Sequence, residues 1–250
     1  MISAGFAVRL LAGAWVWRPP PPVACSSILV ASSNEKYATL STLAERYSSQ
    51  HPQPGGCVAV RVEKVASGVA ESRFAAGWTG SDRPDVWSPA AATWVVLLRL
   101  KLGANQDLLP DSYEGITQSP LVIGMPIDMA EKLGWPATQP SWRDLLLLSQ
   151  DAAGWGRFGK PEWGQFRLGK TDPRVSTSGL HALIATYYAA TTKSADLVAA
   201  DVTGPQNVAF VREVEASVAH YSDTAENFLR SLRAADDIGN GLGYVSAVTL

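Results

Sequence analysis

The sequence predicts an α/β fold, because short apolar runs alternate with amphipathic helical segments along the chain. In the N-terminal half the order strand, serine-containing turn, helix occurs three times, with strands expected at 26–31, 58–65 and 85–87. Such alternation is typical of a parallel or mixed sheet with helices on both faces and right-handed crossovers. A second unit of the same kind begins near residue 120, so two lobes are expected.

Serines mark the start of each helix in the first unit. Ser32 and Glu35 have the spacing of a capping box, which predicts a helix that begins there and ends before the turn at 51–56. Further helices are expected at 67–78 and 90–103. Ligands of parallel α/β sheets bind beyond the carboxyl ends of the strands, against helix N-termini. The candidate ligand contacts at this edge are Ser32, Ser33, Ser67, Gly68 and Ser88.

The second unit opens with an apolar run at 121–125, and Ser119 precedes it. Further strands are expected at 166–169 and 243–249, and helices at 129–133, 141–150, 180–191, 206–219 and 224–234. Its chemically richest stretch is 176–179, where hydroxyls and free backbone N–H groups meet at a helix start and can hold an anion or a carbonyl. The candidate contacts in this unit are Ser119, Ser176, Thr177, Ser178 and Tyr221.

Composition excludes some classes of function. The chain has 250 residues and a formal net charge of −2, which gives no electrostatic argument for nucleic acid or an anionic membrane as a partner. The three histidines are scattered, and neither an H-E-x-x-H nor a C-x-x-C pattern occurs. We therefore expect no metal site and no cofactor.

The N-terminus and the two cysteines suggest an extracellular protein. Residues 1–24 have the apolar character of a signal or anchoring segment and end in a proline-rich spacer. Cys25 follows a weak version of a lipoprotein cleavage site, in which proline takes the place of an aliphatic residue. Cys25 and Cys57 stand at the heads of two consecutive predicted strands, so they can pair if these strands are neighbours. Lipidation and a disulfide are therefore both open for Cys25.

Two motifs point to other chemistry. Residues 164–171 match the phosphate-loop pattern G-x-x-x-x-G-K-[ST], but an aromatic turn precedes them and Asp172-Pro173 follows, where a helix should begin. Ser33 and Lys36 match the S-x-x-K pattern of penicillin-recognising enzymes, although the accompanying motifs are missing. We interpret Lys36 as a first-turn helix residue and keep a serine hydrolase as an alternative.

Several longer segments resemble a known family: the extracellular substrate-binding domain of actinobacterial substrate-binding and von Willebrand factor type A domain-containing proteins. That domain is similar to the type II periplasmic binding proteins, the class of the molybdate and sulfate binders. The segments that carry the resemblance are 30–36, 84–89, 129–136, 161–171, 176–180 and 218–224.

The resemblance implies a two-lobed, non-enzymatic binding module, with lobe I at 25–118 and lobe II at 119–250. It also implies ligand contacts from the serine turns named above. Family members should continue beyond a strand like 243–249, return to lobe I and carry a type A domain. We therefore expect a form without the return to lobe I, whose partner would be a transporter or a type A domain outside this chain.

The expected function is capture of a small polar or anionic solute by serine hydroxyls and backbone N–H groups, without turnover and without Arg or Lys at the turns. A rival interpretation is a cell-surface module that binds a protein or a glycan, because several of the nine tryptophans stand in glycine- and proline-rich turns. It requires Trp155 and Trp163 to be exposed on one face. The hydrolase interpretation requires Lys36 Nζ within hydrogen-bond reach of Ser33 Oγ.

Overall fold

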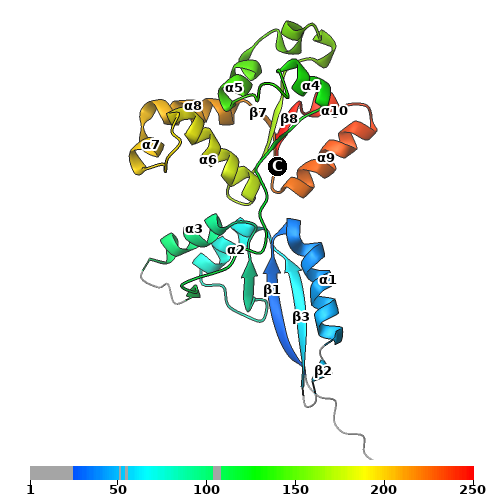
Figure 1. Cartoon of the computed structure of the whole chain (residues 1–250), viewed down its shortest axis with the longest axis vertical. Helices are drawn as coiled ribbons and strands as arrows, with labels where there is room; N and C mark the ends of the chain where they lie inside the picture. Colours follow the sequence, from blue (N-terminus) through cyan, green and yellow to red (C-terminus); the bar gives the residue numbers. More distant parts are fainter. Residues whose placement is uncertain (1–24, 51, 54–55, 104–107) are drawn as a thin grey trace, which may run out of the picture.

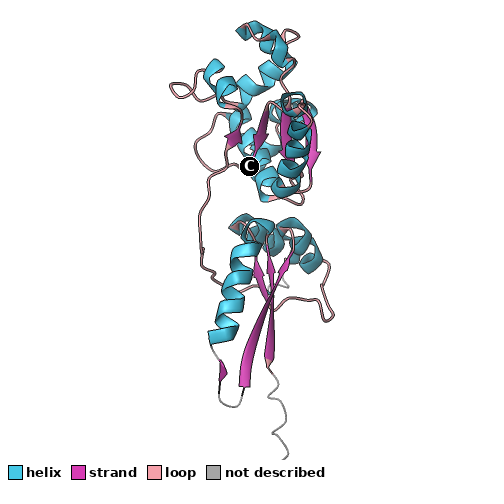
Figure 2. Ribbon diagram, turned by 90° about the vertical axis from the view of Figure 1, so that its right-hand side faces the viewer, coloured by secondary structure: helices cyan, strands magenta, loops and turns pink. Residues whose placement is uncertain are grey.

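A computed structural model describes residues 25–50, 52–53, 56–103 and 108–250. The chain forms two α/β lobes that are stacked along the long axis of the molecule (Figure 1). An exposed, extended segment at 111–122 connects them along one side (Figure 2). The expected signal or anchoring segment, 1–24, lies outside the described residues.

Lobe I contains a four-stranded sheet in the order β2-β3-β1-β4. The strands β1 (Ser26–Ser32), β3 (Gly56–Lys64) and β4 (Val86–Ser88) run parallel, and β2 (Pro52–Gln53) pairs antiparallel with β3 at the edge. The helices α1 (Asn34–Gln50), α2 (Ser67–Ala75) and α3 (Ala92–Leu102) alternate with the parallel strands, as the sequence predicts. The carboxyl ends of these strands face lobe II (Figure 1).

Lobe II contains a mixed sheet in the order β5-β8-β6-β7. The strand β6 (Leu168–Thr171) runs parallel to β7 (Val218–Ser222) and β8 (Ala247–Thr249), whereas β5 (Ile123–Gly124) is antiparallel to β8. Helical segments surround this sheet. They are α4 (Ile127–Lys132), α5 (Trp142–Gln150), η2 (Gly154–Phe158), η3 (Pro161–Trp163), α6 (Thr177–Thr191), α7 (Ala199–Thr203), α8 (Pro205–Ala216), α9 (Ala225–Asp237) and α10 (Gly241–Tyr244).

Several element boundaries differ from the prediction, three of them by a change of conformation. The first helix does not begin at Ser32, because Ser32 completes β1 and pairs with both Lys64 and Ser88. The helix expected at 206–219 ends at Ala216, and 218–222 forms β7, a strand that the prediction missed. The last strand is shorter than expected, since 241–244 forms α10.

The aromatic turns contribute to the core of lobe II, together with apolar side chains of α4, α5, α6, α8, β6 and β8. Trp155 is completely buried, and its ring lies 5.4 Å from that of Trp163 and 6.0 Å from that of Phe166, measured between centroids. The Trp155 indole N–H donates to Ser246 Oγ at 3.2 Å. Trp155 is therefore a core residue, and the exposure that the protein- or glycan-binding interpretation requires of it is absent.

The apparent phosphate loop forms the central strand β6 of lobe II. Its lysine, Lys170, is completely buried and forms an ion pair with Glu215 of α8. A phosphate loop needs a free lysine and backbone N–H groups at a helix start. Here the backbone of the segment is instead paired with β7 and β8. The ion pair of Lys170 and the pairing of β6 agree with the interpretation that residues 164–171 are not a nucleotide-binding site.

Cys25 and Cys57 form a disulfide, with their Cα atoms 4.4 Å apart. The parallel register of β1 and β3 places Ser26 opposite Val58, so the two cysteines also lie opposite each other. This confirms the predicted pairing. The Cys25 thiol is thereby not free for acylation in this structure.

Candidate functional site

A cavity of about 520 Å³ lies between the lobes. Lobe I contributes the first turn of α1, and lobe II contributes the first turns of α6 and α9, while residues 117–121 of the connecting segment close one side. The lining residues are Glu35, Lys36, Ala90, Ala91, Thr117, Gln118, Ser119, Pro120, Leu121, Thr177, Ser178, His181, Ala225 and Leu250. Helix N-termini at strand ends are where ligands of this fold class bind.

Lys36 is the cationic side chain of this lining. Its Nζ donates to Ser88 Oγ at 2.8 Å and to the Pro89 carbonyl at 2.8 Å. Burial lowers the pKa of Lys36, and the nearby Glu35 carboxylate partly opposes this shift. The sequence interpretation expected no lysine at the turns, and this is wrong for Lys36. The S-x-x-K spacing was the available signal, because it puts Lys36 on the first turn of α1 beside the strand ends.

The start of α6 forms the opposite wall. Ser178 Oγ lies 2.8 Å from Thr171 Oγ1 and 3.1 Å from Ser176 Oγ, so three hydroxyls share a hydrogen-bonded chain. A Cβ atom at Gly179 would lie 2.2 Å from the Thr171 carbonyl oxygen, so only glycine lets the helix start pack this closely on β6. Ser178 lines the cavity, whereas Ser176 is buried behind it.

Two of the predicted contacts hold the lobes together. The Gly68 N–H donates to the Val175 carbonyl at 3.0 Å, and a Cβ atom at Gly68 would lie only 2.0 Å from the Arg174 carbonyl oxygen. Thr177 Oγ1 accepts a hydrogen bond from Trp94 Nε1 at 2.8 Å. The Gly68–Val175 and Trp94–Thr177 hydrogen bonds therefore connect the two lobes next to the cavity.

Four predicted residues lie away from the cavity lining. Ser67 Oγ accepts from the Ala90 N–H at 3.0 Å and faces a narrow interlobe slot without space for a ligand. Ser32 Oγ donates to the Ser33 carbonyl, and Ser33 Oγ is buried without a hydrogen-bond partner in the described structure. Tyr221 donates its hydroxyl to Glu215, and burial together with this carboxylate raises the tyrosine pKa.

The structure therefore brings Ser119, Thr177 and Ser178 to one cavity, with Ser88 behind Lys36. It also adds His181, which sequence reasoning did not assign to the site. His181 Nε2 and Thr93 Oγ1 lie 3.1 Å apart across the lobe boundary, and burial lowers the pKa of the histidine. A single histidine in a helix has no sequence pattern that distinguishes it from a core residue.

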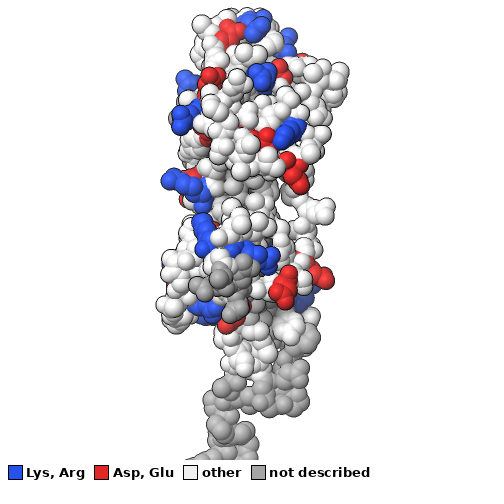
Figure 3. All heavy atoms as spheres, turned by 90° about the vertical axis from the view of Figure 1, so that its left-hand side faces the viewer, with Lys and Arg blue, Asp and Glu red and all other residues white. Residues whose placement is uncertain are grey.

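An ion pair also connects the two lobes, and charges of both signs lie on the surface. Lys64 Nζ of lobe I lies 3.1 Å from Glu226 Oε2 of lobe II. On the face shown in Figure 3, positive and negative side chains are interspersed rather than gathered by sign. This distribution supplies no extended basic surface for nucleic acid on that face.

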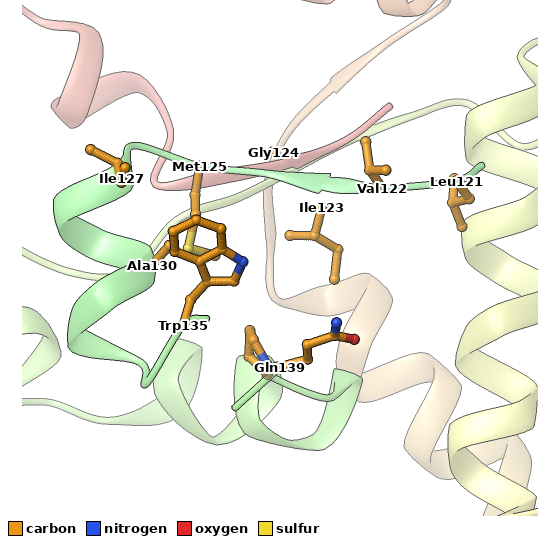
Figure 4. A pocket seen from close by; sticks show the side chains of 10 residues that line it. Leu121, Val122, Ile123, Gly124, Met125, Ile127, Ala130, Trp135 and Gln139 are labelled. Carbon is orange, nitrogen blue, oxygen red and sulfur yellow. The ribbon is translucent and has the colours of Figure 1, made fainter. Parts of the chain in front are cut away.

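A second cavity of about 590 Å³ lies entirely within lobe II, beside β5 (Figure 4). Ile123, Met125 and Trp135 line it, and Gln139 is its one polar, non-aromatic side chain. Ligand pockets orient polar solutes by several placed donors and acceptors. The interlobe cavity, with its hydroxyls and Lys36, meets that requirement and the lobe II cavity does not.

Two further features of the described residues bear on the class of protein. They contain no group of three or more His, Cys, Asp or Glu side chains arranged for a metal ion. Within the same part of the chain, no helix has both the length and the apolar character needed to cross a membrane.

Comparison with known proteins agrees with the two-lobed geometry. The family model for bacterial extracellular solute-binding proteins matches residues 28–250. Among solved structures, a periplasmic thiamin binding protein has a similar fold, with a TM-score of 0.51 and 12% sequence identity over 92% of this chain. The chain spans 63% of the length of that protein. No curated protein matches the chain. Since the family model covers most of the sequence, the chain belongs to the bacterial extracellular solute-binding proteins.

Proposed function

We propose that this protein captures a small polar or anionic solute between lobe I (25–118) and lobe II (119–250) and releases it unchanged. The observation that carries the proposal is the cavity of about 520 Å³ to which both lobes contribute polar groups. Lys36 and the first turn of α1 form one wall, and Ser178 with the first turn of α6 forms the other. A ligand that touches both walls stabilises the closed arrangement over an open one.

The arrangement of the hydroxyls favours binding over catalysis. Ser33 Oγ has no hydrogen-bond partner in the described structure, and Lys36 Nζ is directed to Ser88 and Pro89 instead. The hydrolase interpretation thus lacks the contact between a base and its nucleophile on which it depends. Burial of Trp155 likewise removes one of the two tryptophans that the protein- or glycan-binding interpretation requires to be exposed.

The protein would bind its solute on the outer side of the cytoplasmic membrane. Family membership and the Cys25–Cys57 disulfide support an extracellular or periplasmic environment. Residues 1–24 would then be a signal or anchoring segment, and a transporter or a von Willebrand factor type A domain would be the partner that receives the loaded protein. The thiamin of the structural neighbour belongs to that protein, and at 12% identity the likeness concerns the fold and does not name the solute of this chain.

A thermal-shift screen tests the proposal directly. Oxyanions, sugars, amino acids, organic acids and thiamin are added in turn to the wild-type chain and to Ser178→Ala. A ligand that binds only the folded state stabilises it by about 2.7 kcal/mol at one hundred times its Kd. We expect at least one solute to raise the melting temperature of the wild type and to lose this effect in Ser178→Ala.

Ser194→Ala is the matched control, because Ser194 is exposed and lies outside the cavity lining. It should respond to the solute like the wild type. A solute that stabilises all three proteins equally would place its binding site outside the interlobe cavity and contradict the proposal.

A further inference from the structure

Lys170 is completely buried and Lys36 is partly buried, and the two charges have different partners. Lys170 is paired with the Glu215 carboxylate, and its Nζ lies 5.5 Å from the centroid of the Trp142 ring. Lys36 forms no ion pair with any carboxylate of the described residues. Its ammonium group therefore lies at the wall of a cavity without a paired carboxylate, and Glu35 acts on it only through a longer-range electrostatic attraction.

The neighbours of Lys36 fix its position without neutralising it. Ser88 Oγ and the Pro89 carbonyl are neutral acceptors, and they occupy two of the three N–H donors of the ammonium group. One donor remains, and Lys36 lines the interlobe cavity. Glu35 also lines the cavity, but it is exposed and does not contact the lysine in an ion pair.

The opposite wall adds to the positive potential. The α6 helix has 15 residues and begins at Thr177, so the partial positive charge of its N-terminus lies at the cavity. Ser178 supplies a hydroxyl at the same point. Burial keeps the nearby His181 in its neutral form at pH 7 by lowering its pKa, so the ring does not repel Lys36.

The size and the rest of the lining indicate what carries the anionic group. A volume of about 520 Å³ lies within the range of pockets that hold organic ligands. A bare inorganic oxyanion would leave most of this space filled with water. Pro120, Leu121 and Leu250 provide apolar contacts in the same lining.

We propose that the solute is a small organic anion whose carboxylate or phosphate group pairs with Lys36 Nζ, and that Lys36 makes the protein bind anionic solutes more tightly than neutral ones. The inference rests on the proposed function, which it deepens by naming the class of solute. The remaining lysine donor would form a charge-assisted hydrogen bond, the stronger kind of protein hydrogen bond.

The test compares organic anions with neutral counterparts: succinamide has amides in place of the carboxylates of succinate, and glycerol lacks the phosphate group of glycerol 3-phosphate. Calorimetric titrations of the wild-type chain use succinate against succinamide and glycerol 3-phosphate against glycerol, with inorganic phosphate and sulfate as further arms. We expect one organic anion to bind and its neutral analogue to bind at least tenfold more weakly. The pair that responds distinguishes a carboxylate from a phosphate ester.

Variants of Lys36 then assign the effect to this residue. Loss of a hydrogen bond to a charged group corresponds to a weakening of about 10- to 100-fold, which we expect for Lys36→Gln. Lys36→Arg, which keeps the charge, should retain part of the affinity. Lys132→Gln removes an equal charge from an exposed position on α4 and should bind like the wild type.

Wild-type affinity should also fall when the salt concentration rises from 20 to 200 mM, because salt screens the attraction. This measurement does not depend on the folding of a variant.

Equal binding of anion and neutral analogue, or unchanged anion binding by Lys36→Gln, would overturn the inference. If solute binding were still lost in Ser178→Ala, the inference would fail but the proposed interlobe site would stand. If Ser178→Ala also bound the solute normally, both proposals would fail.

Discussion

At the scale of single residues, the interior of lobe II contains a charged group that the fold has to neutralise. Lys170 projects from the central strand β6, and its side chain is completely buried. Desolvation lowers the pKa of Lys170, while the Glu215 carboxylate raises it again. The Tyr221 hydroxyl donates to the same carboxylate. Glu215 is thus the acceptor for the completely buried Lys170 ammonium group and for the hydroxyl of the exposed Tyr221, and its loss would leave the buried lysine without a carboxylate partner.

We predict that Glu215→Gln lowers the free energy of unfolding by roughly 3 kcal/mol, the lower end of the range for breaking a buried pair. The lower end applies because the Glu215 side chain is 27% exposed, so water can approach the uncovered lysine. Urea denaturation followed by circular dichroism measures the change.

Glu213→Gln is the control for this variant, because Glu213 lies on the same helix and is exposed. It should change stability by less than about 0.5 kcal/mol, as expected for a surface substitution. Equal effects of the two variants would show that the Lys170–Glu215 pair adds no stability.

At the scale of elements, the disulfide fastens the two central strands of lobe I. It joins Cys25, just before β1, to Cys57 in β3, and the two cysteines are 32 positions apart in sequence. Closing a loop of that length restricts the unfolded chain, which is the main stabilising effect of a disulfide in the chain-entropy account. The helix α1 lies inside the closed loop.

We predict that reduction of this disulfide destabilises lobe I by roughly 3–4 kcal/mol, the value the loop length implies. Thermal unfolding in the presence and absence of dithiothreitol measures the effect. The Cys25→Ser/Cys57→Ser double variant should unfold at the same temperature with or without the reductant. A wild type that is insensitive to the reductant would contradict the prediction.

The elements were predictable where one simple pattern dominated. Strands β1 and β3 are continuous or alternating apolar runs, so lobe I could be predicted in its order. Strand β7 is a half-exposed edge strand with alternating burial, and its sequence continues the helical pattern of α8. Pairing with β6 decides its conformation. That pairing is a long-range contact that local patterns do not encode.

The candidate site was predictable in place but not in detail. Serines at helix starts mark the edge of the sheet where ligands bind, and Ser119 and Ser178 do line the cavity. Whether a hydroxyl faces the cavity or the protein depends on tertiary packing. Thr177, for example, accepts from Trp94, and Ser67 accepts from the Ala90 N–H. Lys36 enters the cavity for the same reason, since its acceptors lie more than fifty residues away.

At the scale of the whole molecule, the lobes meet through a few polar contacts around the cavity. Gly68 packs against Arg174 and Val175, Trp94 donates to Thr177, and the Lys64–Glu226 pair lies at the surface. Polar contacts of this kind are exchanged for water at low cost. The lobes can therefore separate and close again without disturbing either core.

We predict that Gly68→Ala opens the molecule. The added Cβ would lie 2.0 Å from the Arg174 carbonyl oxygen, so the lobes must move apart by about the width of the overlap. Small-angle X-ray scattering should show a larger radius of gyration, and the binding of a solute identified in the screen should weaken.

Gly115→Ala is the control, because nothing lies within 4 Å of a Cβ atom at Gly115. It should scatter and bind like the wild type. If Gly68→Ala kept the wild-type scattering curve and affinity, the contact of Gly68 with lobe II would have no influence on closure.

The contact between His181 and Thr93 also links closure to pH. Burial in the closed arrangement lowers the pKa of His181 below its ordinary value of 6.5, whereas opening exposes the ring to water. Between the two pKa values the open form binds more protons, so acid favours opening. The other titratable groups of the lining are Glu35 and Lys36.

We therefore predict that the closed arrangement has its full stability above about pH 6.5 and loses it progressively as the pH falls below this value. Solute affinity of the wild type should fall over the same range of pH, and the radius of gyration should increase.

His181→Gln can still contact Thr93 but cannot be protonated, so its affinity should change less between pH 7.5 and 5. His220→Gln, whose ring stacks on Tyr244 away from the cavity, should follow the wild type. The same loss of affinity in His181→Gln as in the wild type would assign the pH dependence to another group, with Glu35 as the nearest carboxylate of the lining.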